Sequence, residues 1–180
     1  MNNVSGNVPE EGGAVREPFS IPVIIEIPYG SRNKYEWDES LGRFRYDRML
    51  FSSVHYPTDY GFVPDTLSED GDALDALVLV AEPTFPGCYI ESKPVGLFKM
   101  EDEKGLDYKV LCVPVGDPLW NYIDDIAEVP PHLLNEISAF FEIYKSLEAK
   151  EVKVHGWFGR DEALATIERD RRRYADRKAA

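Results

Sequence analysis

The stretch PVGLFKMEDEKGLDYKVLCVPV, residues 94–115, carries the plainest structural signal in the chain. Two runs of strand-forming residues, Val95–Met100 and Tyr108–Val115, flank a short charged segment that contains Gly105. Because glycine adopts tight-turn backbone angles without steric cost, this arrangement is typical of a β-hairpin. We therefore predict two neighbouring strands joined by a charged, solvated loop with Gly105 at its turn.

The rest of the chain repeats this pattern of short strands. Proline and glycine separate the runs, as in PTFPG at 83–87. Many short strands with frequent breakers favour a closed or nearly closed barrel. The further predicted strands are Val23–Ile27, Phe44–Tyr46, Ala76–Ala81, Cys88–Ile90 and Val152–Trp157.

Two segments are predicted to be helical. Apolar residues recur at spacings of three and four from Leu133 to Leu147, and two prolines stand at 130–131, where such a helix begins. The second helix is expected to start near Asp161, a suitable N-cap. Its apolar face would carry Leu164, Ile167 and Tyr174.

The chain has 180 residues, of which 43% are hydrophobic, enough to bury the core of one domain. Residues 1–19 show no periodicity, so we expect a flexible N-terminal segment and a single α+β domain over 20–180. No run approaches the roughly 18 apolar residues of a membrane span. The first residues also lack a basic region followed by an apolar stretch, so we expect a cytoplasmic protein.

The formal net charge is −13, which argues against binding to DNA or RNA because a phosphate backbone demands a basic face. It is compatible with binding divalent cations, which prefer carboxylate oxygens. Cys88 and Cys112 lie within or beside apolar runs and have no metal-ligand spacing. We expect both to be buried free thiols.

The segment SEDGDALDA, residues 68–76, is the richest in chemistry. Asp70, Asp72 and Asp75 place three carboxylates within six residues, Gly71 allows a tight turn, and an apolar run follows at once. Carboxylates on a loop anchored by a buried strand can hold a hard cation. An isolated Asp-Gly-Asp is more often an acidic surface turn. A calcium loop of the EF-hand type is excluded, because the glycine offset is wrong and no closing glutamate follows.

A second acidic cluster, MEDEKGLDYK, occupies residues 100–109. Alone it would be an ordinary solvated hairpin tip. Two such clusters in one small domain could supply ligands for two or more ions. The cations Lys34, Arg48, Lys109 and Lys145 would each, taken singly, be solvated charges. The aromatic residues near them would, taken singly, be core tyrosines.

Six blocks of the chain resemble family I soluble inorganic pyrophosphatases in order and approximate spacing. The resemblance runs from about residue 21 to 157 and implies a small closed five-stranded OB-like β-barrel, with additional strands and two main flanking α-helices. It also implies hydrolysis of pyrophosphate and a homo-oligomer, with a hexamer expected. The blocks are IEIPYGSRNKYE (25–36), YDR (46–48), YPTDYGF (56–62), DGDALDALVL (70–79), PVGLFKMEDEKGLDYKV (94–110) and FFEIYKSLE (140–148).

The resemblance assigns roles residue by residue. Asp72 matches the general base. The cofactor is expected to be Mg²⁺, with Mn²⁺, Zn²⁺ or Co²⁺ as substitutes and Ca²⁺ inhibitory. The implied metal ligands are Asp70, Asp75, Asp102 and Asp107, with Glu26, Glu36 and Tyr56 as auxiliary residues. The implied phosphate clamp is Lys34, Arg48, Tyr60, Lys109, Tyr144 and Lys145.

The chain departs from the family pattern at two places. Ala73 stands where proline or glutamate is usual, which should preserve the backbone path and tune activity. The segment EAKE, residues 148–151, is shorter than in many relatives and lacks an aromatic residue. A phosphate-binding role for Lys150 or Lys153 is therefore not carried over.

Two other function classes compete with an enzyme. An OB-like binding module would need a basic groove with exposed aromatics, whereas here the aromatics are interleaved with carboxylates. A catalytically inactive relative would be expected to lack a ligand or clamp residue, and all six blocks retain theirs.

Overall fold

The computed structural model describes residues 19–148 and 150–179, so the expected N-terminal segment lies outside the described residues except for Phe19. The strands are β1 (Ile21–Ile27), β2 (Asn33–Asp38), β3 (Arg43–Met49), β4 (Asp59–Val63), β5 (Leu74–Val78), β6 (Tyr89–Asp102), β7 (Gly105–Pro114) and β8 (Lys153–Gly159). The helices are α1 (Pro131–Ile143) and α2 (Arg160–Ala179), with short 3-10 turns at Ile126–Glu128 and Ser146–Glu148.

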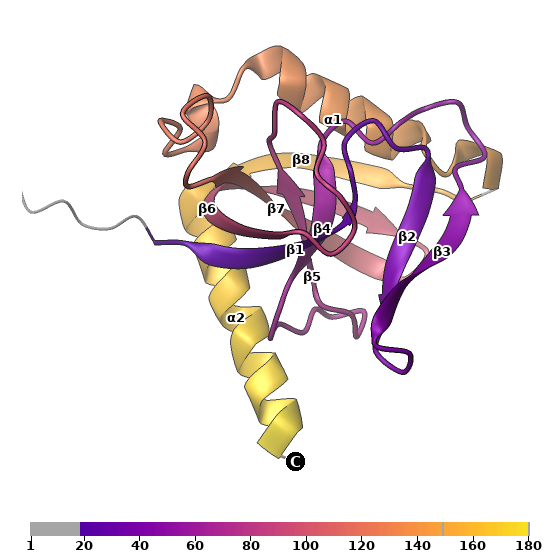
Figure 1. Ribbon diagram of the computed structural model, residues 1–180, viewed down its shortest axis with the longest axis horizontal. Coiled ribbons are helices and arrows are strands. Elements are labelled where there is room, and N and C mark those ends of the chain that lie inside the picture. Colours follow the sequence, from indigo (N-terminus) through magenta and orange to yellow (C-terminus); the bar gives the residue numbers. More distant parts are fainter. Residues whose placement is uncertain (1–18, 149, 180) are drawn as a thin grey trace, which may run out of the picture.

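Five strands close into a barrel in the order β1-β4-β5-β7-β6, because β6 also pairs with β1. The β5–β7 pair is parallel, and the other barrel pairs are antiparallel. Strand β8 extends the sheet beyond β6, while β2 and β3 form a separate hairpin beside the barrel (Figure 1). The closed five-stranded, OB-like α+β fold expected from the sequence is confirmed.

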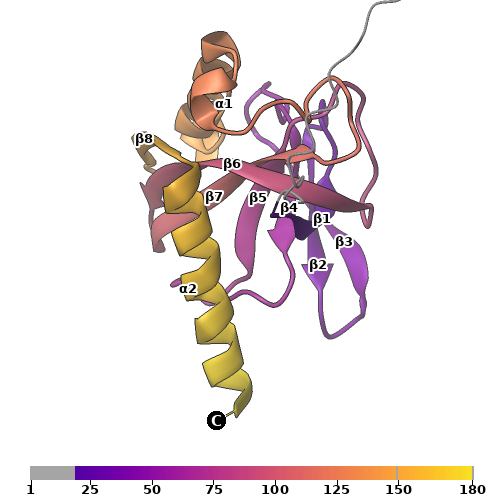
Figure 2. The ribbon, with the colours of Figure 1, turned by 90° about the vertical axis from the view of Figure 1, so that its left-hand side faces the viewer.

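Alternate residues of the barrel strands supply two hydrophobic cores, as the period of two in a strand dictates. On β7, Leu111 and Val113 join the core packed against α1, while Val110 and Cys112 join the core that contains Ala163 and Ile167 of α2. Helix α2 runs along one side of the barrel, and its C-terminal end extends beyond the strands (Figure 2). No helix in residues 19–148 or 150–179 is long and apolar enough to cross a membrane.

The helix boundaries differ from the predictions at two ends. Helix α1 ends at Ile143 instead of continuing to Leu147, and the chain enters a 3-10 turn at Ser146. Helix α2 starts at Arg160, so Asp161 lies in its first turn. The carboxylate that accepts the Arg160 N–H, at 3.0 Å, belongs to Asp125, which lies 35 residues earlier. A cap supplied from so far away leaves no local signal in the sequence.

Three strands, β2, β4 and β6, could be assigned correctly only with tertiary information. The separate runs 88–90 and 95–100 are one long strand, β6, whose register shifts between Pro94 and Gly96 instead of breaking. Strands β2 and β4 were not predicted, because β2 is largely polar and β4 contains Gly61. A Cβ on Gly61 would lie 1.9 Å from the Ile24 carbonyl oxygen, so glycine is required for β4 to approach β1.

The hairpin at 94–115 forms as predicted, with β6 ending at Asp102 and β7 beginning at Gly105, whose φ is +113°. Both cysteines are free thiols. Cys112 is buried, whereas Cys88 is only half-buried, because it precedes β6 on a surface turn.

Candidate active site

A buried lysine lies at the centre of the charged cluster. Lys109 of β7 is 1% exposed, and its Nζ donates to Asp75 Oδ2 and Asp107 Oδ1, each at 2.7 Å. Asp75 and Lys109 are register partners in the parallel β5–β7 pair, which explains their approach. The Tyr60 hydroxyl donates to Asp75 and lies 3.4 Å from Lys109 Nζ. Three neighbouring strands thus bring four predicted site residues together.

Burial governs the charges in this cluster. Burial raises the pKa of Asp107, and the negative charges of Asp75 and Asp102 add to the effect, against the attraction of Lys109. Burial alone would lower the pKa of Lys109, but Asp107 and Asp75 together raise it above its usual value. The lysine is therefore protonated at neutral pH, held between two carboxylates. Burial also raises the pKa of Tyr60 well above 10, so its hydroxyl keeps its proton.

The loop between β4 and β5, residues 64–73, carries the two remaining aspartates of the first acidic cluster. Gly71 has φ of +93°, and the Asp72 N–H donates to Asp70 Oδ1 at 3.1 Å. Partial desolvation of its carboxyl group raises the pKa of Asp70 although the residue as a whole is exposed, and the charges of Asp72 and Asp75 raise it further. Asp72 is exposed, and its Oδ2 lies 3.5 Å from Lys104 Nζ at the tip of the β6–β7 hairpin. The two acidic clusters therefore meet in space.

On the other side of that hairpin, Lys145 Nζ donates to Asp102 Oδ2 at 2.6 Å. Burial opposes ionisation of Asp102, but Lys145 and the Lys104 N–H together hold its pKa below the usual value. Tyr144, beside Lys145, is buried, and its pKa is raised chiefly by that burial. Lys150 lies 2.6 Å from Glu103, so this lysine of the short segment reaches the same hairpin tip.

The β2–β3 hairpin carries two of the predicted clamp cations, Lys34 and Arg48. Lys34 pairs with Glu36 at 2.5 Å and with Asp47 at 3.6 Å. Arg48 forms a two-pronged pair with Glu148, at 2.9–3.1 Å, and also donates to Asp47 at 2.5 Å. Sequence reasoning missed Asp47 and Glu148 as partners, although both lie in the quoted blocks. For Asp47, the available signal was its position directly before Arg48 in the sequence.

The auxiliary residue Glu36 belongs to this hairpin as the partner of Lys34, whereas Glu26 and Tyr56 lie outside the hairpin. Glu26 of β1 accepts the Trp37 N–H at 2.7 Å. Burial, aided by the nearby charge of Asp75, raises the pKa of Glu26 to about 7. Tyr56 is buried with its ring centroid 5.4 Å from that of Tyr60 and 4.8 Å from that of Phe140. Tyr56 thus supports the tyrosine that touches Asp75.

In the described part of the chain, no group of three His, Cys, Asp or Glu side chains is arranged to bind one metal ion. The ammonium groups of Lys109 and Lys145 contact the aspartates instead. The donor set nevertheless fits a hard divalent cation, because it consists of carboxylate oxygens. Burial raises the pKa of both Asp70 and Asp107, and a bound cation would favour their ionised forms.

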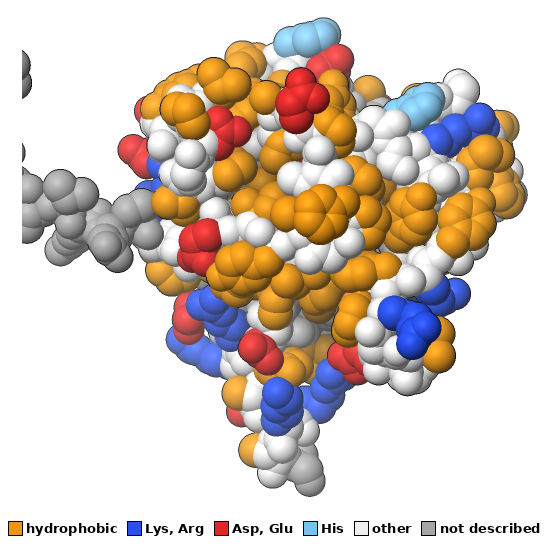
Figure 3. All heavy atoms as spheres, viewed as in Figure 1, with side chains coloured by type: hydrophobic (Ala, Val, Ile, Leu, Met, Phe, Trp, Pro, Cys, Tyr) orange, Lys and Arg blue, Asp and Glu red, His pale blue; other side chains and the backbone are white. Residues whose placement is uncertain are grey.

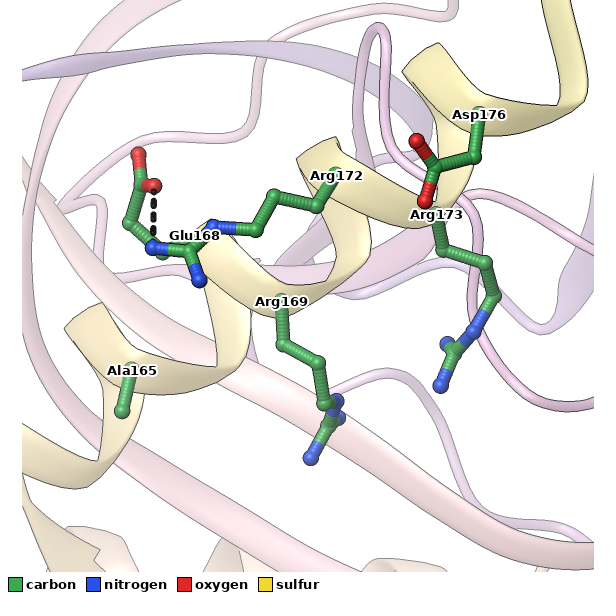
Figure 4. A pocket seen from close by; sticks show the side chains of 6 residues that line it. All are labelled: Ala165, Glu168, Arg169, Arg172, Arg173 and Asp176. Atoms are coloured by element: carbon green, nitrogen blue, oxygen red, sulfur yellow. Dashed lines mark ion pairs between the residues drawn. The ribbon is translucent and has the colours of Figure 1, made fainter.

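Two surface hollows lie elsewhere. One is lined by side chains of α2 alone (Figure 4), and the other lies where residues 124–125 meet residues 158–162. Neither is lined by a member of the charged cluster. The residues to which the sequence assigns chemistry therefore lie outside these two hollows.

Comparisons with known proteins identify the family of the chain. A family model described as inorganic pyrophosphatase matches residues 23–175. The inorganic pyrophosphatase of Methanosarcina mazei is 60% identical over 156 residues, covering 87% of this chain and 92% of that protein. The inorganic pyrophosphatase of Streptomyces coelicolor is 56% identical over 155 residues, covering 86% of this chain and 95% of that protein.

Solved structures agree as well. The Helicobacter pylori inorganic pyrophosphatase has a TM-score of 0.86 at 39% identity, over 92% of this chain and 99% of that one. The Thermus thermophilus enzyme has a TM-score of 0.85 at 47% identity, over 91% and 95%. The matches extend over nearly the whole of each relative, and the chain therefore belongs to the inorganic pyrophosphatase family.

Proposed function

We propose that this chain hydrolyses inorganic pyrophosphate to two orthophosphates with the help of Mg²⁺. One observation carries the proposal: in a member of this family, the buried Lys109 is ion-paired with both Asp75 and Asp107. Family membership implies a divalent metal cofactor in general. The choice of Mg²⁺ rests on the family resemblance, and the all-oxygen donor set is compatible with it. Mn²⁺, Zn²⁺ and Co²⁺ are proposed substitutes and Ca²⁺ an inhibitor.

The carboxylates would hold the cations. The proposed ligands are Asp70, Asp75, Asp102 and Asp107, with Glu26 and Glu36 in outer positions. When bound, the ions would neutralise charge on pyrophosphate and lower the pKa of a bound water. A dense anion such as pyrophosphate repels these carboxylates, so activity should require the cation absolutely.

Asp72 is the proposed general base. Its carboxylate is exposed and lies 3.5 Å from the ammonium group of the exposed Lys104, a weak interaction. It is therefore free to accept a proton from the attacking water, whereas Asp75 and Asp107 are engaged with Lys109. A base must lie close to the ions without being consumed as a ligand.

The clamp would grip the two phosphoryl groups. The guanidinium of Arg48 already makes a two-pronged pair with Glu148, the geometry it would offer to phosphate oxygens. Lys109 and Lys145 would provide compact charges, and the buried Tyr60 keeps a hydroxyl proton to donate. The remaining proposed members are Lys34 and Tyr144. Such preset charge is usually the largest catalytic contribution.

The test measures phosphate release by the purified chain from pyrophosphate, ATP and a simple phosphomonoester, with and without Mg²⁺. We expect Mg²⁺-dependent release that strongly favours pyrophosphate. Absence of release from pyrophosphate would refute the proposed function. Asp72→Asn should lower kcat by about 10²–10⁴-fold with an unchanged circular dichroism spectrum, while Asp176→Asn on α2 serves as the matched control. Full activity of Asp72→Asn would remove Asp72 from the role of base.

We further propose that the protein is cytoplasmic and self-associates, with six chains expected from the family resemblance. On the face seen in Figure 3, hydrophobic side chains gather over the middle of the molecule, while Lys and Arg side chains gather toward its lower part. Exposed apolar patches favour self-association. Size-exclusion chromatography with light-scattering detection measures the mass of the protein in solution. A monomer at micromolar concentration would contradict the proposed self-association.

A further inference from the structure

The C-terminal helix is tied to the loop that carries Asp70 and Asp72. We call residues 64–73, between β4 and β5, the acidic loop. Its distal half closes on itself, because the Ser68 N–H donates to the Asp72 carbonyl at 2.7 Å and the Gly71 N–H donates to the Ser68 carbonyl at 3.2 Å. The position of Ser68 therefore determines where the tip of the acidic loop lies.

Helix α2 holds the loop at its root. The Leu67 N–H donates to the Asp170 carbonyl at 3.0 Å, and Arg173 Nη1 donates to the Leu67 carbonyl at 2.8 Å. Both backbone groups of Leu67 are thus satisfied by residues more than 100 positions later. The Ser68 hydroxyl donates to Asp170 Oδ2 at 2.8 Å, and Arg173 Nη2 lies 3.5 Å from Glu69 Oε1.

Asp170 is the hub of these contacts. It is fully buried, and a buried carboxylate is costly unless it is paired and hydrogen-bonded. Its Oδ1 accepts from Arg169 Nε at 3.0 Å and from Arg173 Nη1 at 3.1 Å, which leaves Oδ2 for Ser68. Removing any one partner would leave the carboxylate less satisfied, so the set behaves as one network.

Figure 4 shows how α2 separates two kinds of arginine. Arg169 and Arg173 project from the same side of the helix, whereas Arg172 turns toward Glu168 of its own helix, 3.6 Å away. The Arg172 side chain is 78% exposed, and its recorded ion pair does not leave α2. Arg172 therefore provides a matched control for Arg173, with the same residue type on the same helix one position away.

We propose that Asp170 and Arg173 are positioning residues that fix the acidic loop and thereby set the metal affinity of Asp70. The inference rests on the proposed function, since it takes Asp70 as a metal ligand. The tip from Glu69 to Asp72 is exposed and contains a glycine, so the barrel alone leaves it free to move. The contacts to α2 reduce that freedom before any cation arrives, as supporting residues do at metal sites.

The test compares Ser68→Ala, Arg173→Ala and the control Arg172→Ala in the full chain. Ser68→Ala removes one hydroxyl and leaves both arginines on Asp170, so the fold should persist even if Arg173→Ala weakens it. The first measurement is the Kd for Mn²⁺ by calorimetric titration without substrate. The second is hydrogen exchange of the amides in residues 68–72.

We expect the Kd for Mn²⁺ to rise roughly 10-fold in Ser68→Ala and Arg173→Ala, with faster exchange at residues 68–72. Arg172→Ala should match the wild type in both. Ser68→Thr, which keeps the hydroxyl, should restore the affinity. A wild-type Kd and wild-type protection in both Ser68→Ala and Arg173→Ala would overturn the inference. If the wild-type chain itself neither binds Mn²⁺ nor cleaves pyrophosphate, the proposed function fails instead.

Discussion

Glu26 offers a test of the site's electrostatics that requires neither metal nor substrate. This glutamate is half-buried on β1, near Asp75, and its pKa is raised from 4.5 to about 7, mainly by burial. Its Oε1 accepts the Trp37 N–H. Replacing it with glutamine keeps the shape and the acceptor oxygen but removes the ionisation. The wild type and Glu26→Gln should therefore differ in how stability depends on pH.

The sign follows from proton binding. Between pH 4.5 and about 7 the folded chain holds a proton on Glu26 that the unfolded chain has released, so stability falls as pH rises. The stabilisation is complete below about 4.5 and is lost as the pH passes about 7. A pKa difference of about 2.5 pH units at about 1.4 kcal/mol each sets an upper bound of about 3.5 kcal/mol. Because solvent reaches the half-buried side chain, we expect about 2 kcal/mol.

The assay is urea unfolding in the presence of a chelator at intervals from pH 4.5 to 8.5. The informative quantity is the free energy of unfolding of Glu26→Gln minus that of the wild type. This difference should grow by about 2 kcal/mol between pH 4.5 and 8, in favour of the variant. Glu39→Gln, in the exposed turn of the β2–β3 hairpin, is the control and should show no such growth. Parallel curves for Glu26→Gln and wild type would refute the assignment of a buried, proton-holding Glu26.

Two further substitutions test the ion pairing and the strand packing around the site. In urea titrations with a chelator present, Lys109→Met should lower the free energy of unfolding by about 3–5 kcal/mol, because Asp75 and Asp107 lose their buried partner. An unchanged urea midpoint would contradict the ion-pair geometry. Gly61→Ala should lower the melting temperature by at least about 6 °C, because its Cβ would meet the Ile24 carbonyl oxygen at 1.9 Å. Gly116→Ala, with open space around the added Cβ, should melt within about 2 °C of wild type.

Local patterns in the sequence predicted most of the fold. The 94–115 hairpin follows from two apolar runs around Gly105, and α1 from its apolar stripe. The failures occurred where distant partners decide the structure. Strand β4 is buried through its neighbours despite Gly61, and α2 begins at Arg160 because Asp125 accepts its N–H.

The candidate site was predictable as a list of residues but not as a geometry. The blocks indicated Asp75, Asp107 and Lys109, yet no spacing in the chain states that Lys109 lies between the two aspartates. That arrangement depends on β5 and β7 being parallel neighbours, which is a property of barrel closure. Glu148 was missed as a partner of Arg48 because it lies 100 residues away in the sequence.

The aspartates of the proposed site fall into two pairs that different parts of the fold hold in place. Asp75 lies on β5 between its register partners Phe62 and Lys109, and Asp107 lies on β7 opposite Met100 of β6, so strands of the closed barrel position both. Asp70 and Asp72 lie on a loop whose root is bonded to α2, a helix that is outside the ring of strands. A perturbation of α2 should therefore weaken the Asp70 side of the site and spare the Asp75 side. We therefore expect the proposed site to have one half positioned by the barrel and one half positioned by the helix.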